Sequence, residues 1–582
     1  MQSGDRMDFT IKVAGEAGQG LQTTGAALAR IFCRLRYHVF THQDYMSRIR
    51  GGHNFYQIRI SDRPLTAPRQ AVHILVALDR ESIDRQAGDP PVTGVILFDP
   101  ETVKEPLQGD TYLPTPFARI AEEVGGKKIM ANTVAVGAVL GLFNVGTETA
   151  ESVVRESLED KSEEMIQANL KALAAGYRHA REKCKVPERF QTRPPQAEKL
   201  LLINGSQAIG FGAVTAGCKF YSAYPMTPST GVMNYLAGKS AEHNIIVEQA
   251  EDEISAINMV LGASYAGVRA MTATSGGGFA LMSEGLSLAG MTETPVVICE
   301  MQRPGPATGL PTRTEQGDLN FVLYGGHGEF PRVVLTPGTP EQAFRATNRA
   351  FDLAEKYQIP VFVQGDQYLA DCEWTGPAFD VSRLRYTDYR LRGAALNELT
   401  GYQRYRFTDN GISPLAVPGA SRHLVVVDSD EHDEDGHIIE DAATRKRMVE
   451  KRLHRKLENL RREIVPPELY GEGNPEILLI GFGSTYGVMK EAVDLLQGTY
   501  PIAMLHFSEV CPFPGLDRLD YRTVLEEARS TLCVELNATG QFARLLRTEI
   551  GFTCSGAVNR YDGRPFTTDD LLTEVMRLFG AA

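Results

Sequence analysis

The chain has 582 residues, with 60 Lys and Arg against 73 Asp and Glu and a formal net charge of −13. Its hydrophobic fraction of 43% and charged fraction of 23% exclude a disordered or fibrous chain, and the length predicts about three to five domains. The sequence has no run of about eighteen apolar residues and is acidic, so we expect no membrane span, no nucleic-acid partner and no secretory signal.

Short apolar strands and helices alternate along residues 1–190, which predicts an α/β domain built on a parallel sheet. The strand candidates are residues 9–14, 72–78 and 95–98, and the helix candidates are the stretch from 21 to about 35 and residues 132–143. Gly18 and Gly20 lie in the first strand-to-helix turn, GEAGQG, where backbone N–H groups favour anions. The spacing differs from the dinucleotide fingerprint, so an ordinary turn and a phosphate site remain equal alternatives.

A proline-rich linker at 183–199 precedes a second α/β domain, which we assign to residues 196–370. Its helix candidates are 205–217 and 251–266, and its strand candidates are 245–248, 269–273, 296–300, 333–335 and 360–363. We assign residues 371–470 to an irregular connector and residues 471–582, which begin with a strand and the turn GFGSTYG, to a last α/β domain. The predicted fold class is therefore α/β, with several parallel-sheet domains.

The connector has an acidic loop at 428–437 and a basic helix after it. The loop fails the calcium-loop template, because Asp433 stands at its sixth position where glycine is needed, so we expect a solvated loop rather than a metal site. In the helix, Val449, Leu453 and Leu457 fall at helical spacing together with Leu460 and Ile464. We expect this stripe to pack inward and the charges to face water.

Three polar segments of the second domain are candidates for chemistry. In YPMTPST (224–230), two prolines fix the backbone around Thr227. In EQAEDE (248–253), carboxylates crowd a strand-to-helix junction, where open α/β sheets bind ligands and where acidic residues also simply cap helices. Arg303 and Arg313 lie in a Gly/Pro-rich loop at 303–318 and are either carboxylate-binding or ordinary surface arginines.

Four motifs in this order resemble the α subunit of 2-oxoacid:ferredoxin oxidoreductases, and the 2-oxoglutarate type most closely. They are YPMTPST at 224–230, AEDEISAINMVLGASYAG at 250–267, ATSGGG at 273–278 and RPGPATGLPTRTEQGDL at 303–319. The N-terminal GEAGQG, with SRIRGGH at 47–53, resembles the γ domain of the same family. The chain therefore resembles a γ–α fusion over essentially its full length. Its domains would be a γ-type domain, a thiamine diphosphate pyrimidine-binding domain and a transketolase C-terminal-like domain.

The resemblance implies a cofactor site shared between subunits. The α chain of this family supplies the pyrimidine half of a thiamine diphosphate site, and a β subunit supplies the diphosphate and Mg²⁺ half and a [4Fe–4S] cluster. The eight cysteines include no CxxC pair, so clusters would have to lie on another chain, and we predict no metal site here. Coenzyme A is the implied co-substrate and ferredoxin the implied electron acceptor. An α2β2 assembly and a cytoplasmic location are also implied.

The resemblance also implies residue roles. Aligning the helix on Gly262 and Gly267 selects Glu253 as the glutamate that hydrogen-bonds the aminopyrimidine ring, whereas matching Gln249 selects Glu251; we favour Glu253. Thr227 matches a threonine that contacts the substrate's carboxylate or carbonyl, and Arg313 matches a loop arginine that reaches the substrate. Tyr224 and Pro225 are assigned to cofactor contact, and Gly18 and Gly20 to the border of the coenzyme A path.

The expected reaction converts 2-oxoglutarate, coenzyme A and oxidised ferredoxin to succinyl-CoA, CO₂ and reduced ferredoxin. Pyruvate or a branched 2-oxoacid is the alternative substrate. Two other functions are weighed against it. A thiamine-dependent ketol-transferase or dehydrogenase component is disfavoured by the fused γ domain, and a non-catalytic assembly subunit would tolerate replacement of the four proposed active-site side chains.

Overall fold

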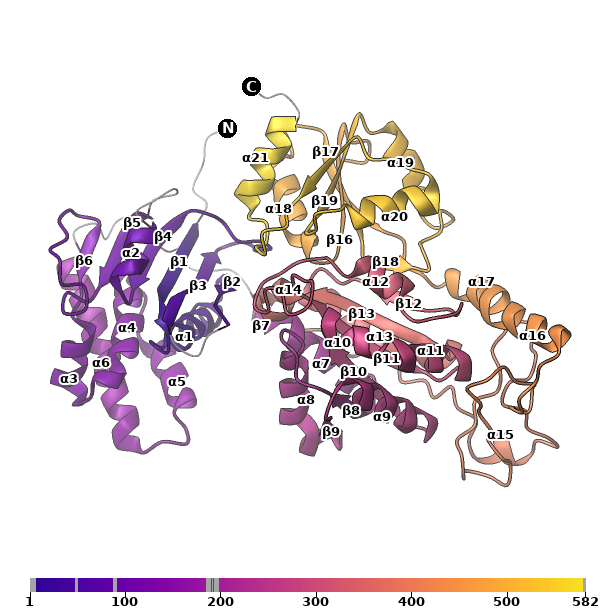
Figure 1. Cartoon of the computed structure of the whole chain (residues 1–582). Coiled ribbons are helices and arrows are strands. Elements are labelled where there is room, and N and C mark those ends of the chain that lie inside the picture. Colours follow the sequence, from indigo (N-terminus) through magenta and orange to yellow (C-terminus); the bar gives the residue numbers. More distant parts are fainter. Residues whose placement is uncertain are drawn as a thin grey trace. The chain divides into compact units, whose positions relative to one another are not determined.

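A computed structural model describes residues 7–47, 51–86, 92–184, 190, 192 and 198–578. The chain forms two compact units, coloured along the sequence in Figure 1. Unit 1 comprises Met1–Ile203, Cys372–Ala378 and Thr567–Ala582, and unit 2 comprises Asn204–Asp371 and Phe379–Phe566. Residues 48–50 of the SRIRGGH motif and most of the predicted linker at 183–199 lie outside the described residues. The predicted four-domain division of the chain stays a prediction.

Unit 1 contains one eight-stranded sheet. Its strands are β1 (Asp8–Ala17), β2 (His38–Asp44), β3 (Gly51–Ser61), β4 (Val72–Ala77), β5 (Val92–Phe98), β6 (Tyr112–Pro114), β7 (Leu201–Asn204) and β14 (Glu373–Gly376). The order is β6-β5-β4-β1-β3-β2-β14-β7. Strand β1 pairs in parallel with β4 but antiparallel with β3, and β2 pairs antiparallel with β3. The sheet is therefore mixed, and its antiparallel half was missing from the prediction.

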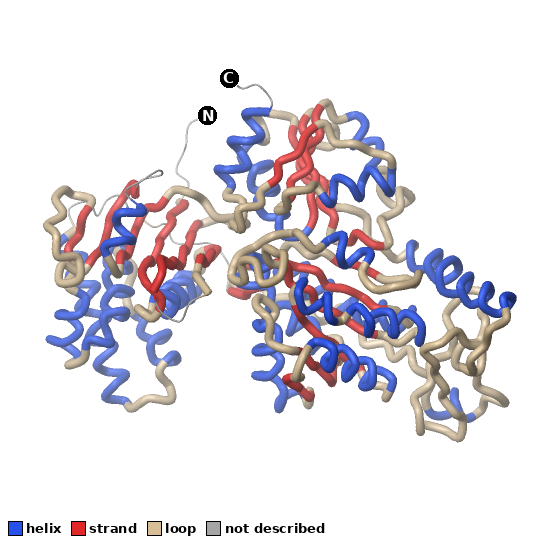
Figure 2. Tube along the Cα trace, in the orientation of Figure 1, coloured by secondary structure: helices blue, strands red, loops and turns tan. Residues whose placement is uncertain are grey.

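Helices pack on the sheet of unit 1 (Figure 2). They are α1 (Leu21–Arg34), α2 (Arg80–Gln86), α3 (Phe117–Gly125), α4 (Ala131–Phe143), α5 (Glu148–Ser157) and α6 (Glu163–Lys183), with a 3₁₀ turn at Lys128–Met130. Helix α21 (Thr568–Leu578) also belongs to unit 1, and its Asp569 accepts from the Gln70 amide at 2.8 Å. Helix α4 is almost entirely buried and lies directly against α6. A Cβ at Gly137 would lie 2.0 Å from the Leu173 carbonyl oxygen, so glycine is what allows this close helix contact.

The larger sheet of unit 2 has seven strands. They are β8 (Cys218–Ala223), β9 (Ile246–Gln249), β10 (Arg269–Thr274), β11 (Val296–Gln302), β12 (Val333–Leu335), β13 (Pro360–Asp366) and β18 (Glu509–Cys511). The order is β18-β12-β13-β11-β10-β8-β9, and every pair except β12 with β18 is parallel. The strands predicted from short apolar runs are present within a few residues of their predicted bounds.

Helices connect the parallel strands of this sheet. They are α7 (Gly205–Thr215), α8 (Thr230–His243), α9 (Glu253–Tyr265), α10 (Gly276–Leu281), α11 (Ser283–Thr292), α12 (Leu319–Tyr324), α13 (Pro340–Tyr357) and α14 (Gln367–Asp371). Helix α7 begins with a capping box, in which Asn204 Oδ1 accepts from the Gln207 amide and the Gln207 side chain accepts from the Asn204 amide. This local signal fixes where the first helix of unit 2 starts.

A second sheet of unit 2 has five strands, β15 (Glu468–Gly471), β16 (Ile477–Phe482), β17 (Ile502–Phe507), β19 (Ser530–Glu535) and β20 (Gly556–Asn559). Its order is β15-β17-β16-β19-β20, with only the β15 pair antiparallel. The helices α18 (Tyr486–Leu496), α19 (Tyr521–Glu527) and α20 (Gln541–Ile550) flank it. One buried apolar cluster includes Phe362 of the larger sheet, Phe279 of helix α10 beside it, and Phe482 and Phe507 of the smaller sheet, so the two sheets share a core.

The connector between the two sheets corrects a prediction. It contains α15 (Gly393–Asn397), α16 (Ala442–Val449), a π-helical turn (Glu450–Arg455) and α17 (Lys456–Arg461). Lys451 and Lys456 do not face water but are fully buried, where their ammonium groups lie 2.7 and 2.5 Å from the two carboxylate oxygens of the buried Glu293. The π turn adds a residue to the helical repeat, which helical spacing alone cannot anticipate.

The acidic loop is also less solvated than predicted. His432 is fully buried, and Arg452 donates to Glu431 at 2.7 Å. The neighbouring acidic residues remain exposed or half-buried, as the sequence suggests.

In the part of the chain that the structure describes, no single helix is long and apolar enough to cross a membrane. Two neighbouring helical segments, Phe117–Gly125 and Lys128–Phe143, reach the required length and apolar composition only when they are taken as a pair, and the chain bends sharply between them.

Candidate functional site

The sequence-predicted polar segments of unit 2 meet at one edge of the seven-stranded sheet. Because β8, β9, β10, β11 and β13 are parallel, their carboxyl ends lie on the same side, where open α/β sheets bind ligands. The segments that leave this edge are the turn at 224–230 after β8, the junction at 250–253 after β9, the glycine turn at 276–278 after β10, the loop at 303–318 after β11 and Asp366 at the end of β13.

Glu253 is the first residue of α9 and is 3% exposed. Asp252 caps the helix, because its Oδ1 accepts from the Ser255 amide at 2.7 Å, so Glu253 is not needed as the cap. The Oε1 atom of Glu253 is buried and has no hydrogen-bond partner among the described residues. Burial raises the pKa of this carboxyl above its ordinary value. A buried carboxyl oxygen without a donor is costly unless a ligand supplies one.

The glycine turn between β10 and α10 lets carboxylates approach its backbone. A Cβ at Gly278 would lie 2.4 Å from Glu253 Oε1, and a Cβ at Gly276 would lie 2.3 Å from Asp318 Oδ2. Any side chain at these positions would displace the carboxylates, so the ATSGGG motif is explained by close approach.

Glu251 lies two residues before Glu253 and differs from it in burial. Its side chain is exposed, in contrast to the buried Glu253. Of the two glutamates that the sequence left as alternatives, only Glu253 therefore has the environment of a carboxyl group withheld from water.

The turn at 224–230 is held from the loop after β11. Tyr224 is 41% exposed, Pro225 is exposed and Thr227 is half-buried. Arg303 Nη1 donates to the Thr227 carbonyl oxygen at 2.7 Å. The turn and the loop are therefore joined directly, although Thr227 and Arg303 are 76 positions apart in the chain.

Arg313 is 9% exposed, which decides against an ordinary surface arginine. A Cβ at Gly563 would lie 3.2 Å from Arg313 Cβ, and the Thr314 amide donates to the Gly563 carbonyl at 3.3 Å. Gln316 fixes the loop further, because its Nε2 donates to the Phe482 carbonyl at 2.9 Å and its Oε1 accepts from the Leu536 amide at 3.0 Å. The smaller sheet thus positions the loop.

Three further carboxyl groups at this edge were not singled out from the sequence. Glu300 is fully buried, and burial raises its pKa well above the ordinary value. Burial also raises the pKa values of Asp318 and Asp366 to about 6. The Ser484 hydroxyl donates to Asp366. An acidic residue ending an apolar strand, as in VVICE and VFVQGD, is the sequence signal that would have found two of them.

The two glycine-rich strand-to-helix turns, GEAGQG in unit 1 and GFGSTYG in unit 2, differ in the space beside them. Gly18 and Gly20 line a cavity of about 360 Å³ in unit 1, and a Cβ at Gly18 would meet no atom within 4 Å. The turn at Gly481 and Gly483 is instead filled by its own chain, because His506 Nε2 donates to the Gly483 carbonyl at 2.9 Å and Gln316 to that of Phe482. Only the first turn leaves room for a ligand.

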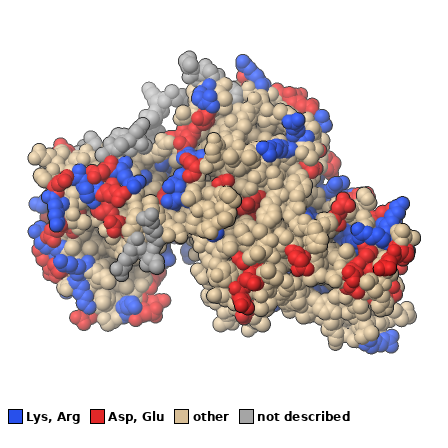
Figure 3. All heavy atoms as spheres, viewed as in Figure 1, with Lys and Arg blue, Asp and Glu red and all other residues tan. Residues whose placement is uncertain are grey.

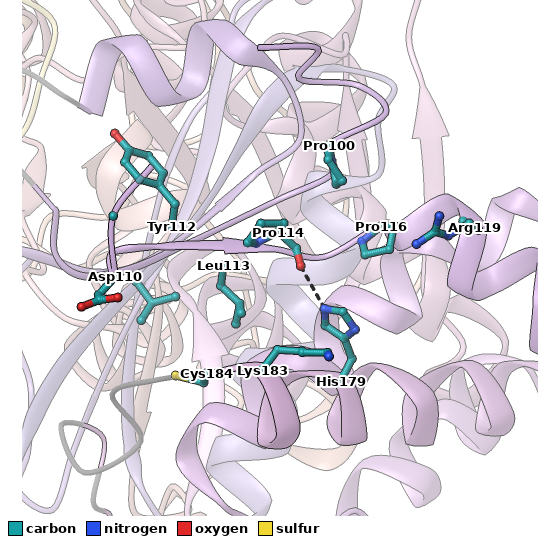
Figure 4. Close-up of a pocket in the computed structure, with 12 residues that line it drawn as sticks. Pro100, Asp110, Tyr112, Leu113, Pro114, Pro116, Arg119, His179, Lys183 and Cys184 are labelled. Carbon is teal, nitrogen blue, oxygen red and sulfur yellow. Dashed lines mark hydrogen bonds between the residues drawn. The ribbon is translucent and has the colours of Figure 1, made fainter. Parts of the chain in front are cut away.

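A separate recess of about 400 Å³ opens in unit 1 beside β6 and α6 (Figure 4). His179 on α6 donates to the Pro114 carbonyl oxygen at 2.9 Å, and Lys183 follows it one turn later. Arg119 lies on the α3 side. None of the predicted site residues lines this recess.

The outward face of α9 is uncharged and mostly apolar. Its exposed residues are Ile254, Asn258, Met259, Gly262 and Tyr265, none of them charged. A Cβ at Gly262 would meet no atom within 4 Å, so nothing in this chain's own packing requires glycine there. Figure 3 shows one face of the molecule, on which much of unit 2 is uncharged, while basic and acidic side chains both gather around α16 and α17.

The eight cysteines are thiols rather than members of disulfides, and most are buried. Within the described ranges, no group of three or more His, Cys, Asp or Glu side chains is arranged to hold a metal ion.

Two family models match the chain. One, described as "Pyruvate flavodoxin/ferredoxin oxidoreductase, thiamine diP-bdg", matches residues 211–451, and "Pyruvate ferredoxin/flavodoxin oxidoreductase" matches residues 10–179. The first match covers Glu253, Thr227 and Arg313, and the second covers Gly18 and Gly20.

Characterised relatives match over nearly the whole chain. A "2-oxoacid:ferredoxin oxidoreductase subunit alpha" from Sulfolobus sp is 32% identical, covering 96% of this chain and 95% of that one. The "2-oxoglutarate oxidoreductase subunit KorA" of Mycobacterium tuberculosis is 29% identical, covering 97% and 90%. The solved structure of a 2-oxoglutarate:ferredoxin oxidoreductase from Magnetococcus marinus, with 2-oxoglutarate, coenzyme A and succinyl-CoA bound, aligns with a TM-score of 0.91 and 32% identity, covering 98% and 100%.

Proposed function

Because the chain belongs to the α subunits of the 2-oxoacid:ferredoxin oxidoreductases, we propose that it oxidises 2-oxoglutarate with coenzyme A to succinyl-CoA and CO₂ and passes the electrons to ferredoxin. The observation that carries the proposal is the buried Glu253 oxygen without a partner at the ligand-binding edge of the sheet. The substrate rests on the Magnetococcus marinus and Mycobacterium tuberculosis relatives, whose names specify 2-oxoglutarate.

Thiamine diphosphate fits the residues around Glu253. A carboxyl group with a raised pKa and a free buried oxygen is suited to hydrogen-bond a ring nitrogen of the aminopyrimidine. When bound, the cofactor supplies the electron sink that allows a 2-oxoacid to lose CO₂. Glu253 orients the ring and holds a proton at its nitrogen, while Tyr224 and Pro225 border the same site. The exposed Glu251 has no part in this proposal.

Thr227 and Arg313 are proposed to bind the 2-oxoacid. The Thr227 hydroxyl donates to the carboxylate or carbonyl oxygen, and Arg313 pairs its guanidinium with a carboxylate. Arg313 is buried and its loop is fixed through Gln316, so the cation is preorganised rather than recruited from a flexible surface. A dicarboxylate such as 2-oxoglutarate needs a second cation, which a partner subunit is proposed to share.

We assign the apolar outward face of α9 to contact with a β subunit. It lies beside Glu253, and the open space at Gly262 leaves room for a close helix contact. The β subunit is proposed to supply the diphosphate and Mg²⁺ half of the cofactor site and the [4Fe–4S] cluster, in an α2β2 assembly in the cytoplasm. The cavity at Gly18 and Gly20 is proposed to border the coenzyme A path.

The test is anaerobic reconstitution of the chain with its β subunit, followed by coenzyme A-dependent reduction of a viologen dye. Turnover should be strongest with 2-oxoglutarate, with pyruvate and a branched 2-oxoacid as comparison substrates. Turnover with pyruvate alone would contradict the substrate assignment and keep the reaction class. A thiamine-loaded, iron-containing complex that reduces no dye with any 2-oxoacid would contradict the enzymatic role.

A further inference from the structure

A groove of about 630 Å³ lies among the helices of unit 1. It is lined by α1, α4 and α5 and by the start of α6, which pack against one another on one face of the sheet (Figure 1). None of the residues assigned above to the cofactor, the substrate or coenzyme A lines it. Its volume falls within the range of about 300–1,000 Å³ that is typical of small-molecule sites.

The wall of the groove is mostly apolar. Ala26 and Ala27 form the α1 side, and their small side chains project little into the space. Ile129, at one edge, is 79% exposed, so a large apolar side chain faces water there. The remaining apolar lining comes from Val136, Val153, Val154, Leu158 and Met165. The groove therefore offers an apolar surface to a bound molecule.

Polar groups inside the groove already bond within the chain. Thr133 Oγ1 donates to Asn169 Oδ1 at 2.8 Å, and Asn169 Nδ2 donates to the Met165 carbonyl oxygen at 2.9 Å. Thr24 Oγ1 donates to the Gly20 carbonyl oxygen at 3.1 Å. A polar group of a ligand would lose its water here without finding an open partner, so the enclosed part of the ligand should be apolar.

The charged residues that line the groove are both cations, Arg30 and Lys161, and both are exposed at its rim. Among the described residues no Asp or Glu lines the groove, and neither cation forms an ion pair. Glu156 on α5 is bound by Arg34 instead, whose Nη1 donates to it at 2.8 Å. In a chain with a net charge of −13, a lining of one positive sign favours an anion.

The groove is a separate space from the cavity at Gly18 and Gly20. Asn132 lies between them, because it lines the groove and a Cβ at Gly20 would come within 2.0 Å of its Nδ2. Of the described residues, only Thr23 lines both spaces. A molecule in the groove would therefore lie beside the proposed coenzyme A path without entering it.

We infer that this groove binds an amphipathic small-molecule anion, with its apolar body along Ala26 and Ala27 and its carboxylate at the rim beside Arg30 and Lys161. The α1 helix rises about 10 Å from Thr23 to Arg30, which suits an extended ligand of modest length. A medium-chain carboxylate such as octanoate has the required charge and apolar body. The inference concerns a binding site of this chain alone and does not depend on the proposed reaction.

The test measures binding of octanoate to the full chain by isothermal titration calorimetry, with 1-octanol and acetate as comparison ligands. Octanoate should bind at least about tenfold more tightly than octanol, because only octanoate carries a charge for the two cations. Acetate, which lacks the apolar body, should give no measurable binding. The double variant Arg30→Gln, Lys161→Gln should bind octanoate and octanol equally. Lys171→Gln removes an exposed cation of α6 that does not line the groove, so it should match the wild type.

Ala27→Phe places a large side chain in the groove and should abolish octanoate binding, with circular dichroism and thermal unfolding to show that the variant is folded. Octanoate binding no tighter than octanol binding in the wild type would overturn the proposal. Unchanged octanoate binding in the double variant would overturn it as well, and this result does not depend on the folding of Ala27→Phe.

The same titration on the complex with the β subunit, with and without coenzyme A, separates the groove from its surroundings. Octanoate should bind with similar affinity in each case. Loss of binding on assembly would assign the groove to a subunit contact, and competition by coenzyme A would assign it to the coenzyme A path; either result would overturn a separate ligand site. A complex that binds octanoate but turns over no 2-oxoacid would contradict the proposed function and support this site.

Discussion

Two buried glutamates of unit 2 have opposite environments. Glu253, at the carboxyl edge of the sheet, has an oxygen without a donor and no neighbouring cation among the described residues, and burial raises its pKa. Glu293, at the end of α11, lies between the ammonium groups of Lys451 and Lys456, and its pKa is well below the ordinary value despite complete burial. Burial alone therefore does not mark a functional carboxyl group.

The difference shows which buried carboxyl group is neutralised by the chain itself and which one is left without a partner. The charge of Glu293 is compensated within the chain, and Arg404 Nη2 also donates to its carbonyl at 2.7 Å, so the cluster fastens the connector to α11. No group of the described chain donates a hydrogen bond to the buried oxygen of Glu253. A side chain that binds a ligand needs such an open position. The comparison predicts that one glutamate matters for activity and the other for stability.

Replacing Glu253 with Gln should produce the largest effect. Activity of the complex should fall about 10²- to 10⁴-fold, because the carboxyl group that serves the cofactor ring is lost. The free energy of unfolding should stay equal or rise. Because the folded chain binds the Glu253 proton more tightly than the unfolded chain, stability from that proton is lost as the pH rises through the raised pKa, and Gln removes this loss. Glu251→Gln is the matched control in turnover and thermal unfolding, and equal losses in both variants would contradict the distinction.

Replacing Glu293 with Gln should give the opposite result. It leaves two buried ammonium groups without their counter-charge and should lower the free energy of unfolding by about 3–5 kcal/mol, measured by denaturant unfolding. The triple variant Glu293→Met, Lys451→Met and Lys456→Met should recover most of this loss, because no charge remains buried. A triple variant as unstable as the single one would show that the cluster acts by shape rather than charge.

His506 extends the comparison from buried acids to a buried base that has no counter-charge among the described residues. Burial lowers its pKa to about 4, and its Nε2 donates to the Gly483 carbonyl, so it is neutral in the folded chain. Its contribution is present above the unfolded pKa of about 6.5 and is lost as the pH falls toward 4, by about 3 kcal/mol in total. The unfolding free energy of His506→Gln should fall less than that of the wild type between pH 7 and pH 4.5; parallel curves would contradict this.

The smallest effect concerns the α9 surface. Gly262→Ala should stabilise the isolated chain by up to about 1 kcal/mol, because alanine favours the helix and its Cβ meets no atom. The same change should weaken assembly with the β subunit, measured by sedimentation of the mixed chains. Gly238→Ala on α8, where a Cβ also meets nothing, is the control. Equal assembly by both variants would remove α9 from the proposed interface.

Much of the fold followed from sequence patterns because buried parallel strands are continuous apolar runs. VVICEMQ and PVFVQGD were found in this way, whereas β2 and β3 of unit 1, HVFTHQD and GGHNFYQIRIS, mix polar and apolar residues and were missed. The buried lysines of the connector were missed for a related reason. Lysine side chains are usually exposed to water, so a sequence pattern predicts them on the surface. Their burial here depends on the tertiary contact with Glu293.

The sequence predicted which motifs form the candidate site, but it did not predict the contacts between them. Glu253 and Glu251 could not be separated by alignment, but they differ plainly in burial. The link from Arg303 to Thr227 joins residues far apart in the chain, and no local pattern encodes such a contact.

The most direct measurement is hydrogen–deuterium exchange at the thiazolium carbon between sulfur and nitrogen, followed by NMR on thiamine diphosphate bound to the assembled complex without substrate. The central claim is that Glu253 activates the cofactor ring. It predicts an exchange rate at least about 100-fold lower in Glu253→Gln than in the wild type and unchanged in Glu251→Gln. Wild-type exchange in the Glu253 variant, with the cofactor still bound, would contradict the claim.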